Sequence, residues 1–581
     1  MNKLWLCSLF LVAAAGCHHA SSGNQDGSTT TNHDGAVVIP DGFMQSSDGS
    51  IVPIGDGGVV TMPDAGNQAT DRSVLQRGNN IYRHGTYTQP LLTKAAALTM
   101  ATDTTFNTNA TFPANGNTQG QGMASVLYVE KGPPSAGCPA GASGCTATAR
   151  AAGDGVFLAF PPLGSNPNII AFDETTGLTT WSAHVTAGSD GIRGTPVVDP
   201  VSRHIFLVTG NNPHMVRAVS LDTGAEVTTG GWPLKLASDT LSYNGNAFAS
   251  QLENQHGALL LMNDTLYIPF GGENGDIGAY YGWIVAVNIT DPTKYAGWAT
   301  QSVKSGIWGT GGLASDGTYV FGTTGNTGGL ARNVSDSEEL VRVKGLAEFT
   351  RDANSIFVPT EWQAWDGSDL DFASGTPAYI PLPPGSTPAS VVFAEGKGGR
   401  VFVVDGQNFS SGMYPTPGGH LADLAVSGVT QNSIYTSPTI YKTASGIHAA
   451  INVGGSLQAN GVSCPAGTQT SSEEYISVLI KPGQTPIAAT AWCASNQGQG
   501  GGTSNHPPIS TTSDGDMADP IVWFTDNGQI TGVDGDTGQH IVTTNGASCD
   551  SLFSMSFPIA VKGRIVVAAL GHLCSWSPNG Q

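Results

Sequence analysis

Short apolar runs alternate with turn residues along almost the whole chain. Val, Ile, Thr and Tyr gather in runs of strand length, and Gly, Asn, Asp and Pro separate these runs. No long window shows apolar residues at the 3.6-residue period of an amphipathic helix. This pattern is typical of many short β-strands joined by tight turns. We therefore predict an all-β chain.

One unit of this pattern occurs three times. In each copy an apolar strand ends in a polar residue, and Thr-Gly follows; the copies lie at 171–177, 218–224 and 532–538. We expect the Asp or Ser side chain to accept hydrogen bonds from turn amides, while the glycine takes a positive φ at no steric cost. A unit of this kind, repeated within one chain, indicates a repeat architecture.

A second recurrence marks the beginnings of sheets. A small or turn residue, often with Pro, opens an apolar strand at eight places: 123–128, 194–198, 256–260, 308–313, 374–378, 436–440, 518–522 and 556–559. Eight sheet units predict a single β-propeller of about eight four-stranded blades, because radial repetition leaves no long exposed edge. The last unit is too short for four strands, so we expect residues 85–106 to supply its outer strand. The alternative is a two-domain array of β-sandwiches.

The N-terminus has the features of an export signal. Lys3 precedes an apolar stretch of 12 residues, Leu4–Ala15, which is too short to span a bilayer. The following Cys17 ends Ala-Ala-Gly-Cys, which resembles the lipobox of bacterial lipoproteins. The resemblance implies a signal peptide over 1–17 and lipid on Cys17. His18 in place of Asp after this cysteine favours the outer membrane or cell surface. The alternative is an ordinary secretory signal.

The residues after Cys17 differ in composition from the rest. Residues 18–75 are rich in Gly, Ser, Asp, Thr and Asn and contain almost no aromatic side chains. Such a segment cannot bury enough apolar surface to offset the entropy of ordering. We predict a disordered tether over 18–75, followed by the propeller over 76–581.

Cysteine usage agrees with export. Beyond Cys17, six cysteines remain: Cys138, Cys145, Cys464, Cys493, Cys549 and Cys574. An even number in an exported chain indicates disulfides, and six cysteines allow fifteen pairings. Closeness along the chain favours pairing each with its neighbour in this order. No C-x-x-C spacing exists, so we expect disulfides rather than a metal site.

The charge balance excludes one class of partner. The chain of 581 residues has 23 basic and 44 acidic residues, which gives a net charge of −21. No cluster of Lys and Arg occurs, and binding to phosphate backbones needs a concentrated basic face. We therefore predict no nucleic-acid partner.

The first repeat copy carries a family resemblance. Residues 171–181, which end in Trp181, resemble the repeat of the pyrroloquinoline-quinone (PQQ)-like propellers, in which this Trp docks between neighbouring blades. Exported bacterial proteins with PQQ-binding-like repeats are similar over further short stretches, at 259–268, 280–283, 306–308, 370–375 and 396–400. The resemblance implies a PQQ-like propeller and extends over roughly 155–410.

The resemblance leaves more than one function open. A non-catalytic binding or scaffold module would bind an envelope protein, as the outer-membrane assembly lipoproteins with this repeat do, or a surface glycan. The alternative is a PQQ- and calcium-dependent dehydrogenase of alcohols or sugars. A glycan-cleaving propeller is a third hypothesis and requires paired carboxylates across the cavity. No Gly-x-Ser-x-Gly or His-Glu-x-x-His motif is present, and we favour binding over catalysis.

Polar and aromatic residues near the sheet beginnings are the candidate site. For a cofactor at the channel mouth these are Arg193, His256, Trp308, Asp369 and Asp371. Asp366, Asp369 and Asp371 supply closely spaced carboxylates, which suit calcium. The alternatives are a hydrogen-bonded channel lining, turn caps and inter-blade packing. We interpret Glu395 and Lys397, in a Gly-rich segment, as a β-turn with a surface ion pair.

Overall fold

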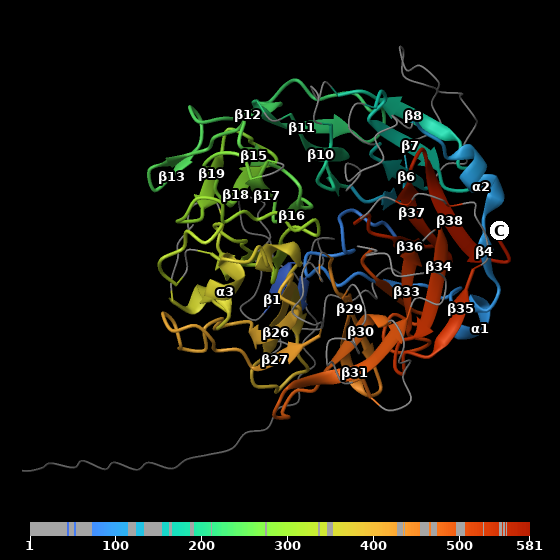
Figure 1. The fold of residues 1–581 in the computed structure, drawn as a ribbon. Coiled ribbons are helices and arrows are strands. Elements are labelled where there is room, and N and C mark those ends of the chain that lie inside the picture. The colour runs from blue at the N-terminus through green and yellow to red at the C-terminus, as the bar shows by residue number, and fades with distance from the viewer. Residues whose placement is uncertain are drawn as a thin grey trace, which may run out of the picture. The chain divides into compact units, whose positions relative to one another are not determined.

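A computed structural model describes most of the chain, and nearly all of its elements are strands (Figure 1). The described residues are 43–45, 51–53, 72–113, 124–132, 154–161, 165–185, 191–210, 212–273, 276–334, 337–345, 353–426, 434, 436–453, 464–465, 473–495, 506–526, 528–544, 549, 552 and 555–580. The predicted signal peptide with Cys17, most of the predicted tether, Cys138 and Cys145 lie outside them.

The chain divides into two units, Met1–Val60 and Thr61–Gln581. In the first, β1 (Phe43–Gln45) pairs antiparallel with β2 (Ile51–Pro53). The second contains eight sheets arranged as the blades of a propeller. The prediction of an all-β propeller with eight four-stranded blades is confirmed.

The blades are numbered in chain order. Blade 1 has β5 (Leu127–Val129), β6 (Val156–Ala159), β7 (Ile169–Asp173) and β8 (Thr179–Ala183). Blade 2 has β9 (Val197–Asp199), β10 (His204–Thr209), β11 (His214–Ser220) and β12 (Leu234–Leu236). Blade 3 has β15 (Glu253–Asn254), β16 (Leu260–Met262), β17 (Thr265–Gly272), β18 (Trp283–Asn288) and β19 (Tyr295–Ala299). Blade 4 has β20 (Ala314–Ser315), β21 (Val320–Thr323), β22 (Leu340–Val343) and β23 (Ile356–Phe357).

The second half continues in the same way. Blade 5 has β24 (Ala378–Pro381), β25 (Ser390–Gly396), β26 (Arg400–Asp405) and β27 (Ala422–Ala425). Blade 6 has β28 (Thr439–Thr443), β29 (Gly446–Asn452), β30 (Glu473–Ile480) and β31 (Ala488–Ser495). Blade 7 has β32 (Ile509–Thr512), β33 (Ile521–Asp526), β34 (Gln529–Asp534) and β35 (His540–Thr543), with β3 (Thr86–Thr88) added in parallel. Blade 8 has β36 (Ile559–Val561), β37 (Arg564–Ala569), β38 (His572–Pro578) and β4 (Met100–Thr102).

The remaining described elements are short. A hairpin of β13 (Ser242–Tyr243) and β14 (Asn246–Ala247) follows blade 2. The helices are α1 (Lys94–Ala97), α2 (Thr104–Asn109), α3 (Trp362–Asp366), and the 3-10 turns η2 (Ala353–Ser355) and η3 (Phe372–Ser374). Among the described residues, none of these helices has the length and apolar character needed to cross a bilayer.

The ring closes through the strand that the sequence predicted. β4 pairs antiparallel with β38, and Trp576 faces Thr102 in the register. The predicted range 85–106 therefore contains the strand that completes blade 8, as expected, while its first part, β3, pairs with blade 7. Seven of the eight predicted sheet beginnings precede or overlap the strand that opens a blade; in blade 3 this strand is β16, which pairs with the same edge of β17 as the short β15. The exception is 518–522, which leads into β33, the second strand of blade 7. The first strand there is β32, whose sequence Ile-Ser-Thr-Thr has only one apolar residue.

An N-terminal segment bonds to the first strands of the blades in turn. Backbone bonds join Val74 to Tyr128, Val198 to Leu75, Ser315 to Ile81, Tyr379 to Tyr82, Ile440 to His84 and Ser510 to Gly85. These partners lie on the first strands of blades 1, 2, 4, 5, 6 and 7, in that order. Residues 74–85 therefore pass from one first strand to the next around the ring of blades. Residues 72–75, placed in the tether by sequence, already bond to the propeller.

Two buried arginines hold this segment in place. Arg83 donates to the carbonyl oxygens of Leu313 (2.6 Å), Leu259 (2.9 Å) and Arg77 (2.5 Å). Arg77 donates to Ser125 Oγ and Thr310 Oγ1 at 3.0 and 3.3 Å. Burial lowers the pKa of each arginine to about 9, and the charge of Arg77 also lowers that of Arg83. Each side chain is at most 2% exposed, so water does not replace these contacts.

Tryptophans lock neighbouring blades at the repeated turns. Trp181 of blade 1 donates to the Leu221 carbonyl of blade 2 at 2.9 Å, and Trp492 of blade 6 donates to the Gly535 carbonyl of blade 7 at 2.9 Å. Each ring packs against the glycine that ends the repeat, Gly224 or Gly538, where a Cβ would lie 2.7 or 2.8 Å from a ring carbon. Both glycines have a φ near the left-handed region, at 71° and 70°. A repeat copy without its own Trp thus receives one from the preceding blade.

Two of the three predicted disulfides lie in the described residues. Cys464 pairs with Cys493 and Cys549 pairs with Cys574. Both pairings agree with the prediction from closeness along the chain. The predicted Cys138–Cys145 pair lies outside the described residues.

Candidate ligand-binding site

One end of the propeller collects the predicted site residues. Antiparallel strands reverse direction, so segments that precede a first strand lie at the same end as turns between second and third strands. Trp308 and Asp371 precede first strands, and Asn326 and Lys397 follow second strands. We call the surface formed by these segments in blades 2 to 5 the site face.

Lys397 is the centre of the site face. Its Nζ lies 2.5 Å from Asp371 Oδ2 and 3.2 Å from Asp369 Oδ1. The same atom lies 5.2 Å from the centroid of the Trp308 ring. The side chains of Lys397 and Asp371 are 8% and 7% exposed, whereas Asp369 is 71% exposed. A buried ion pair therefore lies beside the exposed carboxylate of Asp369, which also accepts from Asn326 Nδ2 at 3.1 Å, and beside a partly exposed indole.

Asn326 and a glycine complete the surroundings of Asp371. Asp371 Oδ1 accepts from the backbone N and the Nδ2 of Asn326, at 2.8 and 2.7 Å. A Cβ on Gly325 would lie 2.5 Å from Asp371 Oδ1 and 3.2 Å from Trp308 Nε1. Glycine at this position therefore lets the carboxylate and the indole approach the same stretch of backbone.

Glu338 is fully buried and lies close to Asp371. Its Oε2 accepts from Phe372 N at 2.5 Å, and within the described residues Oε1 has no hydrogen-bond partner. Burial, and next the charge of Asp371, raise the pKa of Glu338 well above its usual value. Burial therefore favours the protonated form of the Glu338 carboxyl beside the ion pair of Lys397 and Asp371.

Asp366 has a different set of partners. Its carboxylate accepts from Thr327 N at 2.6 Å, from Thr327 Oγ1 at 2.9 Å and from Ala331 N at 3.3 Å. The side chain is buried and holds the loop over 327–331 against α3. This arrangement is the turn-capping alternative from the sequence. The predicted calcium site of Asp366, Asp369 and Asp371 stays a prediction, with Asp366 bound to backbone.

Arg193 and His256 form a separate group. Arg193 Nη1 lies 3.4 Å from Glu273 Oε1. Arg193 and Glu273 line a small cavity together with His214 and Gln255. Burial, and next the charge of Arg193, lower the pKa of His256 to about 3. Among the described residues, His256 Nε2 has no hydrogen-bond partner. This histidine is therefore neutral and close to Arg193.

The structure thus joins Trp308, Asp369 and Asp371, and it groups Arg193 with His256. Sequence reasoning missed Lys397, Asn326 and Glu338 as members of the site. The predicted turn after Glu395 exists between β25 and β26, but the surface ion pair does not: Glu395 is fully buried, and Lys397 pairs with Asp371. The signal that could have identified Asn326 and Lys397 was their place in the repeat, because each follows the second strand of its blade and the two blades are adjacent.

The sequence as a whole is unlike characterised families. No protein-family model matches the chain, and no curated protein matches it. The fold, in contrast, is similar to many solved structures.

Two quinohemoprotein alcohol dehydrogenases are among them. The chain matches ADHIIG from Pseudomonas putida HK5 with a TM-score of 0.56 at 12% identity, over 88% of this chain and 81% of that one. The enzyme from Comamonas testosteroni gives 0.53 at 12% identity over the same shares. A europium-containing methanol dehydrogenase gives 0.53 at 12% identity, over 88% of this chain and 91% of that one. The chain shares the propeller fold of quinoprotein dehydrogenases. At this identity the likeness concerns the fold and not the activity.

Proposed function

We propose that this chain is a lipid-anchored binding module of the cell envelope, and that its site face binds a surface glycan or an envelope protein. The observation that carries the proposal is the partly exposed Trp308 ring beside the fixed carboxylate of Asp369 and the ion pair of Lys397 and Asp371. An aromatic face with a few oriented polar groups is the usual composition of a ligand site.

The chemistry of these groups suits a polar ligand with a flat face. A sugar ring stacks on an indole through its C–H face, and its hydroxyls bond to carboxylates. The buried pair holds Asp371 and Lys397 in place before binding, so little side-chain entropy is lost on association.

Two features support a location outside the cytoplasm. Cys17 ends a lipobox-like sequence, and two disulfides are present among the described residues. Disulfides persist in oxidising compartments. Metabolic labelling with an alkyne fatty acid tests the anchor: label is expected on the wild-type chain and absent from C17S, and equal labelling contradicts lipidation.

Binding is tested with variants of the site face. The probes are a panel of envelope oligosaccharides and detergent-solubilised envelope proteins, applied to wild-type chain, W308A and D369N. The matched control is Y295A, which removes a partly buried ring from the outer strand β19. Binding that weakens at least ~10-fold in W308A but not in Y295A supports the proposal. Equal binding by all variants places the ligand elsewhere and contradicts it.

A PQQ- and calcium-dependent dehydrogenase is the second candidate. The observation that favours it is that the Trp308 ring lies on the site face with Asp369, Asp371 and Asn326. The ion pair of Lys397 and Asp371 fits a bound calcium ion poorly. Lys397 Nζ already occupies the cation position at Asp371 and lies close to the Trp308 ring, and both oxygens of Asp371 are bonded.

This candidate has its own test. Purified chain is mixed with PQQ and Ca²⁺, and dye reduction is followed over alcohols and sugars. Turnover in wild-type chain that is lost in D371N would favour the dehydrogenase. Absence of both turnover and a bound-quinone spectrum removes it and leaves the binding proposal intact.

A further inference from the structure

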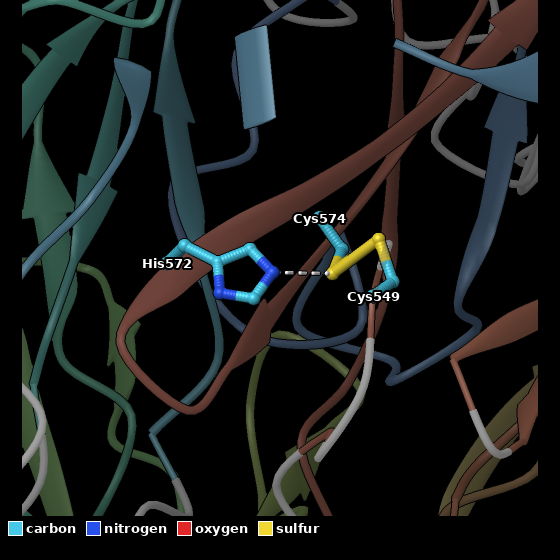
Figure 2. A group of neighbouring side chains, drawn as sticks. All are labelled: Cys549, His572 and Cys574. Atoms are coloured by element: carbon cyan, nitrogen blue, oxygen red, sulfur yellow. Dashed lines mark hydrogen bonds between the residues drawn. A yellow bond between two sulfur atoms is a disulfide. The ribbon is translucent and has the colours of Figure 1, made fainter. Parts of the chain in front are cut away.

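Three metal-ligating atoms meet at strand β38 of blade 8 (Figure 2). The site face defined above belongs to blades 2 to 5. Cys549, His572 and Cys574 each place one ligand atom within 4.8 Å of the other two. His572 and Cys574 are two residues apart on β38, so their side chains point to the same side of the strand. The sequence predicted the Cys549–Cys574 disulfide but not its neighbour His572, for which the two-residue spacing to Cys574 was the available signal.

The histidine is held in the tautomer of a metal ligand. His572 Nδ1 lies 3.2 Å from the Leu570 carbonyl oxygen, and a carbonyl only accepts, so Nδ1 carries the proton. Nε2 therefore presents a lone pair, and it lies 3.4 Å from Cys574 Sγ. A disulfide sulfur has no proton to donate to that lone pair. The partners that suit Nε2 are a thiol S–H or a metal ion.

Burial of the two cysteines in the core opposes thiolates, and a hydrogen-bond donor beside them favours one. Cys549 and Cys574 are fully buried, and His572 is partly exposed, which gives a small ion a route to the group. Asn107 Nδ2 lies 3.4 Å from Cys549 Sγ. A side-chain N–H directed at sulfur favours the anionic form of that sulfur. Asn107 thus orients Cys549, as Leu570 orients His572.

We propose that Cys549, Cys574 and His572 bind one zinc ion when the disulfide between the two cysteines is reduced. A phosphine reductant and one water convert the disulfide to two thiols and a phosphine oxide. Zinc then displaces the two thiol protons and accepts electron pairs from two sulfurs and from His572 Nε2. Two thiolates and one imidazole are a zinc donor set, and water fills the fourth position.

The required movement is small. Zinc–sulfur and zinc–nitrogen bonds are about 2.3 and 2.0 Å long, so ligand atoms on one ion lie roughly 3.5 Å apart. The three atoms already lie within 4.8 Å of one another. His572 and Cys574 are held on β38 by their pairing with Ala569 and Val567 of β37, so we expect Cys549 to adjust most.

The test uses the full chain, reduced anaerobically by a phosphine, and Co²⁺ as a spectroscopic substitute for zinc. Reduction also opens Cys464–Cys493, so the comparison rests on histidine variants. Wild-type chain and H540Q, which changes an exposed histidine on β35, are expected to take up one ion with a thiolate-to-cobalt absorption. H572Q is expected to bind at least ~10-fold more weakly, and the oxidised chain not at all.

Two results overturn the proposal. One is equal cobalt affinity of reduced wild-type chain and H572Q, which would place the ion on other cysteines. The other is no uptake by the reduced wild-type chain. Circular dichroism of each reduced variant checks that the propeller is folded. C549S provides a second test, because it removes a thiolate, prevents this disulfide and leaves His572 in place.

Discussion

Lys397 Nζ lies 2.5 Å from Oδ2 of Asp371, and both side chains are less than a tenth exposed. The two residues come from different segments of blade 5, one before its first strand and one after its second. Burial removes both charges from water, and the attraction between them offsets the cost of this desolvation. Removing one partner of this buried pair is therefore expected to cost more folding stability than removing one partner of an exposed ion pair.

Replacing Lys397 with Met leaves Asp371 as a buried carboxylate without its cation. We expect the free energy of unfolding to fall by about 3 to 5 kcal/mol. Lys235→Met is the matched control, because Lys235 and Asp239 form an ion pair with side chains 47% and 67% exposed. That control is expected to cost less than about 1 kcal/mol. Urea denaturation at pH 7 measures both, and similar losses would contradict the importance of burial.

The N-terminal segment over 74–85 predicts a second stability effect. Arg83→Met removes donors to three buried carbonyl oxygens. We expect a loss of at least about 3 kcal/mol, because those acceptors lose their partner without gaining water. Arg203→Met removes a partly exposed pair with Asp222 and is expected to cost about 1 kcal/mol. Thermal unfolding compares the two; an unchanged midpoint in the Arg83 variant would show that the segment does not stabilise the ring.

Contacts between blades are tested at Trp492. Trp492→Ala removes a fully buried ring that packs on Gly538, and we expect a loss of about 3 to 5 kcal/mol. Trp492→Phe keeps most of the packing and removes the bond from Nε1 to Gly535, so about 1 kcal/mol is expected. Chemical denaturation distinguishes the two. Equal losses would mean that the hydrogen bond, and not ring packing, joins blades 6 and 7.

Buried histidines predict a loss of stability in acid. His84 is 4% exposed, and burial lowers its pKa from 6.5 to about 4. Between these values the unfolded chain binds a proton that the folded chain does not. Stability therefore falls as the pH falls from 6.5 to 4, by up to ~1.4 kcal/mol per pH unit for this group.

The measurement is the unfolding midpoint of wild-type chain, His84→Gln and His184→Gln across that pH range. The His84 variant is expected to show a shallower slope, because it removes one of the titrating groups. His184 is exposed, so its variant is expected to follow the wild-type curve. Parallel curves for all three chains would show that protonation of His84 does not control acid stability.

Only part of the candidate site could be predicted from the sequence. Trp308, Asp369 and Asp371 were predictable because they precede apolar strands. Asn326 and Lys397 were not, because their importance depends on which turns meet across blades 4 and 5. Lys397 was interpreted as half of a local ion pair with Glu395. The structure buries Glu395 and directs Lys397 to Asp371, which is 26 residues earlier in the chain.

The sequence by itself determined the all-β class, the eight sheets, the closing strand near Met100 and two disulfides. These features depend on local periodicity, turn chemistry and nearby cysteines. Tertiary structure alone decided that residues 74–85 bond to the first strands of six blades, that β32 begins blade 7, and which charges pair at the site face. These features arise from contacts between segments distant in the chain, where burial and the need to pair buried polar groups override local preference.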